Sequence, residues 1–272
     1  MPELPEVETI ARDIAPQVTG ARIGPVRIHK SDVLRNAKPA AFARALEGRR
    51  IAALTRRAKH LVFLLDDGVR MVIQPRMTGS LSVTRRPTRD PYAVLEFPLD
   101  GARRLTFRDV RRLGAVLLLS PARWASYEAR LGPEPLAPDF TPTRLAAALK
   151  GGRLAVKKAL MDQRRLAGVG NIYANEALWI ARIDPSRPAA GLRPAEIARL
   201  HRAVVDVLRL AVEGRGTTVR DYRTGTGGPG NFQGRLAVYE RAGKPCLACG
   251  RRIALTHAID QRATYFCPWC QS

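Results

Sequence analysis

Cysteine, lysine and acidic residues are scarce in this sequence of 272 residues. The four cysteines all lie in the last 27 residues, which excludes a disulfide framework through the whole chain. No run of about 18 apolar residues occurs, which excludes a hydrophobic helix that spans a membrane. The first twenty residues carry charged side chains and lack the apolar core of a signal peptide. We therefore expect a cytoplasmic protein.

The charge of the chain is strongly unbalanced, with 46 basic and 24 acidic residues and a net charge of +22. Such an excess predicts a polyanionic partner, with nucleic acid ahead of an anionic membrane surface. Residues 150–272 carry a net +12 and residues 1–149 a net +10, so both halves should contact the polyanion. A ribosomal or architectural protein has the same balance. Charge therefore indicates the partner and leaves the activity open.

The N-terminal sequence Met1-Pro2-Glu3 has two interpretations. If Met1 is removed, Pro2 exposes a secondary amine that can attack an electrophilic carbon and form an iminium ion. An α-amino group has a pKa near ~8, so a sizeable fraction is uncharged at neutral pH. Glu3 would be the adjacent proton donor.

The same stretch is also typical of a helix start. Pro5 suits the first turn, and Glu6 and Glu8 suit the positive end of the helix dipole. Apolar residues follow at helical spacing, at Leu4, Val7, Ile10 or Ala11, and Ile14. Both interpretations can hold together.

The rest of the first half has short apolar or alternating runs that predict an antiparallel β-sandwich or barrel. Asp67-Gly68 and Asp100-Gly101 are hairpin signals between such runs. A helix over residues 40–46 interrupts the strands. The expected strands are residues 21–28, 50–56, 61–65, 69–73, 80–83, 93–97, 104–107 and 115–119.

Three turns in this half carry candidate functional side chains. Lys59, one of only seven lysines, follows a strand and provides either a solvated charge or a reactive amine. Met77 lies on a basic turn, where it could pack in the core or insert as a wedge between bases. Leu113 is the apolar tip of a second such turn, and Arg111 beside it could pair with a base edge.

Residues 131–138 hold three prolines and a glycine, which exclude a regular helix or strand. We predict an α+β protein with a β domain over residues 1–131, a linker over 132–140, a helical domain over 141–235 and a separate C-terminal element over 236–272. The expected helices are residues 141–149, 154–163, 172–180 and 194–212.

The helical half contains two glycine-rich segments. Gly168-Val169-Gly170-Asn171 predicts either a tight turn with Asn171 as helix cap or a phosphate clamp, and Lys157 could serve the same phosphate. Residues 224–233 predict a mobile segment, either a linker or a loop that orders over a ligand.

The four cysteines form two pairs, Cys246 with Cys249 and Cys267 with Cys270. Each pair has two intervening residues, and this spacing is typical of a tetrahedral zinc site. Two disulfides are the weaker alternative in a cytoplasmic protein.

Taken together, these motifs resemble the formamidopyrimidine-DNA glycosylase family from end to end. The resemblance rests on the N-terminal sequence 2–8, the lysine motif 57–59, the helix-two-turn-helix sequence 168–174 and the four-cysteine end with Gln261-Arg262-Ala263-Thr264. It implies a monomeric, nucleoid-associated enzyme with one structural Zn²⁺. Such an enzyme excises oxidised purines from double-stranded DNA, including 8-oxoguanine opposite cytosine and formamidopyrimidines, and cleaves the strand by β,δ-elimination.

The resemblance also implies roles for individual residues. Pro2 would attack C1′ of the lesion nucleotide, Glu3 would protonate the opening sugar ring, Glu6 would support both, and Lys59 would contact the lesion strand. The DNA-binding residues would be Met77, Arg111, Leu113, Lys157, Asn171 and Arg262. The lesion-binding residues would be Glu176, Gly225, Gly227 and Phe232. The zinc ligands would be Cys246, Cys249, Cys267 and Cys270.

Some positions depart from the family pattern. Gln74-Pro75-Arg76 stands where the family commonly has His-Leu-Gly, and Leu113 stands where it commonly has phenylalanine, which weakens stacking on the orphan base. Glu240 replaces a usual glycine, for which the sequence offers no physical reason. Two rivals remain: an endonuclease VIII-like enzyme for oxidised pyrimidines, against which Leu4 argues, and a non-catalytic zinc-bearing DNA-binding protein.

Overall fold

The computed structural model describes residues 2–85, 90–151, 153–219 and 221–272. The chain divides into two compact units, each made of two segments. Unit 1 contains Met1–Ala129 and Gly214–Asn231, and unit 2 contains Arg130–Glu213 and Phe232–Ser272. Residues 224–231, which the sequence places with the helices, thus belong to unit 1.

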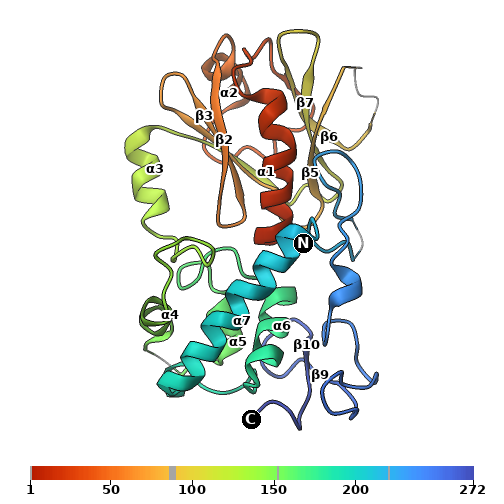
Figure 1. The fold of residues 1–272 in the computed structure, drawn as a ribbon. Helices are drawn as coiled ribbons and strands as arrows, with labels where there is room; N and C mark the ends of the chain where they lie inside the picture. Colours follow the sequence, from red (N-terminus) through yellow and green to blue (C-terminus); the bar gives the residue numbers. More distant parts are fainter. Residues whose placement is uncertain (1, 86–89, 152, 220) are drawn as a thin grey trace. The chain divides into compact units, whose positions relative to one another are not determined.

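Unit 1 begins with helix α1 (Leu4–Val18), drawn in red in Figure 1. Leu4, Val7, Ile10 and Ile14 are fully buried, so the helical spacing of these apolar residues is confirmed. At the start of the helix, the Glu3 amide donates to Glu6 Oε2 at 2.8 Å. This hydrogen bond satisfies one of the amides that a helix N-terminus leaves without a helical partner.

Two four-stranded antiparallel sheets form the rest of unit 1, in the orders β1-β6-β7-β5 and β2-β3-β4-β8. Side chains of both sheets and of α1 share one hydrophobic core. Asp67-Gly68 joins β3 to β4 and Asp100-Gly101 joins β6 to β7, so both predicted hairpins are confirmed. The strands are β1 (Arg27–Ile28), β2 (Ile51–Arg57), β3 (His60–Leu65), β4 (Arg70–Gln74), β5 (Gly79–Thr84), β6 (Ala93–Pro98), β7 (Arg104–Asp109) and β8 (Ala115–Leu119).

Two elements of unit 1 differ from the sequence-based expectation. The first predicted strand is reduced to β1, because Gly24 and Pro25 interrupt the run before it. Helix α3 (Pro121–Glu128) was not predicted, although Ser120 and Pro121 are a helix-start signal: Ser120 Oγ accepts from the Arg123 amide. Helix α2 (Pro39–Leu46) matches its prediction.

Unit 2 begins with helices α4 (Pro142–Leu149), α5 (Val156–Met161), α6 (Asn171–Ala181) and α7 (Pro194–Glu213) (Figure 1). The apolar face predicted for α7 is buried, at Ile197, Leu200, Val204, Val207, Leu208 and Ala211. Helix α5 is shorter than predicted, because the Gln163 side chain turns back to donate to Met161 O. Single 3₁₀ turns lie between α6 and α7, at η1 (Ala189–Gly191), and after α7, at η2 (Gln233–Arg235).

Unit 2 ends in the antiparallel hairpin of β9 (Ala254–Thr256) and β10 (Thr264–Phe266). Strand β10 packs against α6. Among the described residues, no helix combines the length and the apolar character that crossing a membrane requires.

Candidate active site and DNA-binding residues

Pro2 and Glu3 are buried at the start of α1. Met1, on whose removal the predicted amine depends, lies outside the described residues. Glu6, one turn into the helix, is 1% exposed, and its two carboxylate oxygens accept from two backbone amides. These are Glu3 N at 2.8 Å and Thr217 N at 2.7 Å. Glu6 therefore fixes the backbone of the N-terminal segment to a part of the chain that lies 211 residues away.

That remote part is the second segment of unit 1, residues 214–231, which contacts α1 at several points. Arg215 forms an ion pair with Asp13 at 2.8 Å. The Tyr222 hydroxyl donates to Arg215 O at 3.1 Å, and burial together with the nearby Glu6 charge raises the pKa of Tyr222 above its ordinary value. Gly225 lies directly on α1, where an added Cβ would be 2.7 Å from Asp13 Cβ. Sequence reasoning missed Asp13, Arg215, Thr217 and Tyr222, because no local pattern marks a partner so distant.

Gly216 packs against the Glu6 side chain, where no residue with a Cβ fits. Its φ is +81°, in the left-handed region that favours glycine, and an added Cβ would be 2.9 Å from Glu6 Oε1. Any side chain would displace the carboxylate that holds the N-terminal segment.

The predicted loop residues Gly225 and Gly227 lie in a turn in which the Thr224 amide donates to Gly228 O at 2.9 Å. Gly227 has a φ of +87°. The third predicted loop residue, Phe232, belongs to unit 2 and is 3% exposed, with its ring 6.1 Å from that of Tyr173. In this structure, Phe232 is thus a core residue of unit 2.

Lys59 is half-buried in the turn between β2 and β3. The preceding residue, Ala58, has a φ of +52°, which is unfavourable for a residue with a Cβ. Arg56 stabilises this turn, because it donates to Ala58 O at 2.9 Å and to Glu8 of α1 at 2.8 Å. Burial alone would raise the pKa of Glu8, but the hydrogen bonds and charges of Arg56 and Arg12 outweigh burial and lower it. Arg56 therefore links the backbone next to Lys59 to helix α1.

The two predicted apolar tips are exposed, Met77 by 42% and Leu113 by 43%. They lie on turns that are joined by hydrogen bonds. Thr78 Oγ1 donates to Asp109 Oδ1 at 2.5 Å and accepts from the Arg111 amide at 3.0 Å. The Arg111 guanidinium contacts Met77 Sδ at 3.3 Å. The structure thus brings Met77 and Arg111 into contact. The apolar side chains of Met77 and Leu113 are exposed to solvent on these two turns.

The departures at Gln74 and Arg76 have structural consequences. Gln74 is buried and donates to the Tyr127 hydroxyl at 2.8 Å. Arg76 has a φ of +56° and Glu240 a φ of +57°. Both residues thus hold a left-handed backbone, which favours glycine and is unfavourable for a residue with a Cβ.

In unit 2, Lys157 and Asn171 converge on the hairpin. Lys157 is fully buried, and its ammonium donates to Ala263 O at 3.1 Å and to Thr264 Oγ1 at 2.7 Å. The Asn171 amide also donates to Ala263 O, at 3.1 Å. Ala263 directly follows Arg262, which is exposed. Three predicted phosphate contacts are therefore neighbours in space, and two of them hold β10 in place.

Asn171 is not the cap of α6, because Gly170 occupies the cap position and makes no side-chain hydrogen bond. The turn before the helix is held by Gln163 instead, which accepts from Gly168 N at 2.9 Å and donates to Val169 O at 2.8 Å.

Glu176, predicted to bind the lesion, is 2% exposed inside unit 2. Its carboxylate accepts from the amides of Ala237, Val238 and Tyr239 at 2.8 to 3.0 Å. Burial raises the pKa of Glu176, although these three hydrogen bonds oppose the shift. The contacts support a role in holding the chain that leads from α7 to the cysteines.

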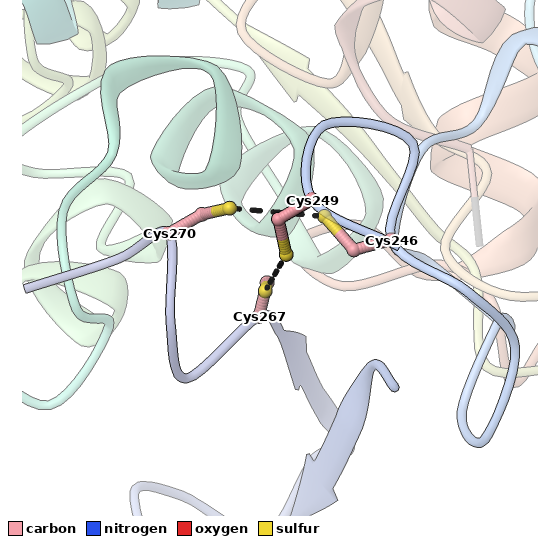
Figure 2. A group of neighbouring side chains, drawn as sticks. All are labelled: Cys246, Cys249, Cys267 and Cys270. Carbon is pink, nitrogen blue, oxygen red and sulfur yellow. Dashed lines mark hydrogen bonds between the residues drawn. The ribbon is translucent and has the colours of Figure 1, made fainter. Parts of the chain in front are cut away.

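The four cysteine side chains converge, as Figure 2 shows, and their sulfurs all lie within 4.8 Å of one another. Cys249 and Cys267 sulfurs are 3.6 Å apart and those of Cys246 and Cys270 are 3.9 Å apart, so these are free thiols and not disulfides. A tetrahedral zinc ion with Zn–S bonds of about 2.3 Å requires sulfurs about 3.8 Å apart. The donor set and its spacing therefore fit such an ion.

Two residues outside the thiols position this group. The Trp179 indole N–H, on α6, donates to Cys246 Sγ at 3.4 Å. Burial alone would raise the pKa of Cys246, but hydrogen bonds, with Trp179 first, lower it to about 6. Gln271 accepts from the Cys267 amide at 2.8 Å and donates to Ile183 O at 2.9 Å. Both link the cysteines to the region of α6, and neither was predicted.

The chain is similar to known proteins along most of its length. A family model for the formamidopyrimidine-DNA glycosylase N-terminal domain matches residues 1–116, and a model for the formamidopyrimidine-DNA glycosylase H2TH domain matches residues 131–223. The formamidopyrimidine-DNA glycosylase of Chloroflexus aurantiacus is 46% identical over 272 residues, covering 100% of this chain and 98% of the relative.

Two solved structures are similar over almost the whole chain. The MutM (Fpg) protein of Thermus thermophilus is 42% identical with a TM-score of 0.88, covering 99% of this chain and 98% of that one. The Fpg of Lactococcus lactis, in a complex with DNA containing N7-benzyl-Fapy-dG, is 30% identical with a TM-score of 0.92 and covers 100% of both chains.

Proposed function

This chain belongs to the formamidopyrimidine-DNA glycosylase family, and from that premise we propose that it is a bifunctional DNA glycosylase and abasic-site lyase. Its substrates would be oxidised purines in double-stranded DNA, namely 8-oxoguanine opposite cytosine and formamidopyrimidines. The observation that carries this proposal is the buried Pro2-Glu3 segment, held to α1 and to Thr217 by the Glu6 carboxylate.

The proposed chemistry starts with removal of Met1, which frees the Pro2 amine. The amine attacks C1′ of the lesion nucleotide, the bond from C1′ to the base breaks, and the base leaves with the electron pair and takes up a proton. Glu3 donates a proton to the sugar oxygen as the ring opens, which leaves an iminium ion between Pro2 and C1′. Proton removal from C2′ then expels the 3′ phosphate, and a second elimination expels the 5′ phosphate.

The damaged base must leave the stack before an amine can reach C1′. We propose that Met77 and Leu113 fill the space and that Arg111 pairs with the orphan cytosine. Their exposure and the contact between Arg111 and Met77 support this role. An apolar group that replaces the missing stacking partner offsets part of the cost of unstacking. Lys59, held in its strained turn by Arg56, would contact the lesion strand.

In unit 2, we propose that Lys157, Asn171 and Arg262 contact backbone phosphates and that the four cysteines hold one Zn²⁺. The ion would act structurally, since four thiolates leave no open position for a substrate or water. Glu176 would act as a positioning residue and not as a lesion contact, because its carboxylate is engaged by three amides. The enzyme would act as a monomer.

Borohydride trapping tests this function. The wild-type protein is mixed with duplexes that carry 8-oxoguanine opposite cytosine or an oxidised pyrimidine, and borohydride reduces the iminium ion to a stable covalent adduct. We expect the adduct with the 8-oxoguanine duplex; its complete absence would refute the enzyme, and stronger trapping on the pyrimidine duplex would favour the endonuclease VIII-like alternative. Mass analysis of the active protein should find Pro2 at the N-terminus, and an intact Met1 in fully active protein would overturn the mechanism.

Two variants separate the steps of the reaction. Pro2→Gly should greatly reduce trapping, because the secondary amine is lost. Glu3→Gln should block base excision, because the amide cannot donate the proton. The matched control is Glu47→Gln on an exposed surface of unit 1, which should trap like wild type. A fully active Glu3→Gln protein would remove the proton-transfer role.

A further inference from the structure

The buried ammonium of Lys157 has an anionic neighbour on the hairpin. Asp260 Oδ1 lies 3.8 Å from Lys157 Nζ, and its side chain is 12% exposed. Asp260 belongs to the loop between β9 and β10, two residues before Arg262. The Asp260 carboxylate thus lies near the Lys157 ammonium, which also donates to Ala263 O and Thr264 Oγ1.

The hydrogen bonds of Asp260 are incomplete. Its Oδ1 accepts from the Arg262 amide at 2.6 Å, while its Oδ2 is buried with no hydrogen-bond partner in the part of the chain that the structure describes. A buried carboxylate oxygen without a donor carries an uncompensated desolvation cost. The ion pair at 3.8 Å is also too long for a direct hydrogen bond. Asp260 is therefore held weakly for a side chain so little exposed.

The groups around Asp260 are suited to a larger anion. The Asn171 amide and the Lys157 ammonium both donate to Ala263 O, so they lie close together. Arg262 is exposed, and within the described ranges its guanidinium forms no ion pair. An ammonium, an amide and a guanidinium in one place can bind a phosphodiester, whose oxygens accept several hydrogen bonds at once.

We propose that Asp260 is an internal anion that competes with a DNA backbone phosphate for Lys157. The inference rests on the proposed DNA-binding role of Lys157, Asn171 and Arg262. When DNA binds, its phosphate displaces the Asp260 carboxylate, and the loop tip moves away with it. Until then, Asp260 offsets the charge of Lys157 and lowers the affinity for undamaged DNA, which a chain with a net charge of +22 would otherwise bind tightly.

The experiment measures the affinity of Asp260→Asn for an undamaged duplex by fluorescence anisotropy at fixed ionic strength. Asparagine keeps the oxygen that accepts from the Arg262 amide and removes only the charge. The control is Asp206→Asn on the exposed side of α7, which changes the net charge by the same amount. We expect Asp260→Asn to bind about fivefold more tightly than wild type, because the long ion pair that competes with a phosphate is lost, and Asp206→Asn to change the affinity by less than about twofold.

A second variant tests whether the effect passes through Lys157. In a Lys157→Met background, the gain from Asp260→Asn should disappear. If Asp260→Asn binds no more tightly than Asp206→Asn, or binds less tightly and unfolds at a lower temperature, the carboxylate is only structural and the inference is wrong. Should Lys157→Met fail to fold, the comparison of the two aspartate variants still decides.

The outcome is independent of the proposed chemistry, because the duplex is undamaged and no reaction occurs. A wild-type protein that forms no borohydride adduct would refute the glycosylase function, and a gain in Asp260→Asn would still support the competing anion. Conversely, an adduct with the wild type together with no gain would refute only the role of Asp260.

Discussion

In unit 1 the residues around Pro2 are positioned by backbone amides that donate hydrogen bonds to the Glu6 carboxylate, whereas in unit 2 the hairpin is positioned by four thiols and a buried ammonium. The first arrangement is complete within the polypeptide, since Glu6 satisfies amides at Glu3 and Thr217 directly. The second brings four sulfurs within 4.8 Å of one another, which is stable for thiolates only with a cation among them.

The difference predicts which part of the molecule would depend on a metal ion held by the four cysteines. Unit 1 should keep its local structure whatever the metal content, because none of its described contacts involves the cysteines. The hairpin should lose its structure without metal, because β9 and β10 are only three residues each and cannot supply a core of their own. Four predictions test this contrast.

The largest effect is expected for Cys267→Ser, which removes a buried thiol from the metal site. We expect metal affinity to fall by at least about 100-fold, and DNA affinity to fall with it as Arg262 and Ala263 lose their positions. Metal content by mass spectrometry and DNA affinity by anisotropy measure these losses. Hydrogen exchange of α1 should stay at the wild-type rate; faster exchange there would show that the two units are not held independently.

Glu6→Gln is expected to loosen unit 1 and leave the metal bound. The glutamine NH₂ group would face a backbone N–H that now donates to a carboxylate, either at Glu3 or at Thr217. Loss of one such buried hydrogen bond costs about 1–3 kcal/mol, so the amide that loses its acceptor, at Glu3 or at Thr217, should exchange about 10- to 100-fold faster. Glu47→Gln, on an exposed residue, is the control. Equal exchange in both variants would rule out the role of Glu6 in this contact.

Trp179→Phe should affect the metal site more mildly. The ring is kept, but the N–H that donates to Cys246 Sγ at 3.4 Å is lost. Residues that support metal ligands in this way change metal affinity by about tenfold, so a chelator should remove the metal several-fold faster. Trp269→Phe is the matched control, since that indole is 58% exposed and stacks on Arg251. If both variants release metal at one rate, the indole hydrogen bond has no effect on the ion.

The smallest effect is expected for Glu240→Gly. Glycine relieves the left-handed backbone at φ +57° but gains freedom in the unfolded chain. These two terms nearly cancel, so the free energy of unfolding should rise by about 0.5 kcal/mol. Denaturant unfolding measures the change. Ala125→Gly, on an exposed position in the middle of helix α3, is the control and should lower stability by about 1 kcal/mol. A loss of stability in Glu240→Gly would mean that a contact of the Glu240 carboxylate stabilises the protein by more than the backbone strain destabilises it.

Local sequence patterns were sufficient for most elements of both units, although they missed helix α3. Alternating apolar residues located the strands of unit 1, and Asp67-Gly68 and Asp100-Gly101 located its hairpins, because aspartate and glycine favour the short turn that joins two neighbouring antiparallel strands. Helical spacing located the buried faces of α1 and α7. The spacing of the cysteines brought together four ligands, because a two-residue gap within each pair lets both thiols face one ion.

Local patterns did not predict how the functional residues are held. Glu6 and Thr217 are 211 residues apart, and Lys157 and Ala263 are 106 apart. Their hydrogen bonds form only in the folded chain, where distant segments lie side by side, and no local spacing in the sequence predicts which segments these are. The same is true of Asp260 beside Lys157 and of Trp179 beside Cys246.

The sequence by itself thus determined most of the secondary structure, the basic charge, the clustered thiols and the family, because each of these depends on residue type and on neighbours within a few positions. Only the tertiary structure decided that Glu176 and Lys157 are buried and hydrogen-bonded, and that residues 214–231 complete unit 1. Burial and long-range hydrogen bonds are properties of the folded chain, since they arise when distant segments exclude water from the same polar group.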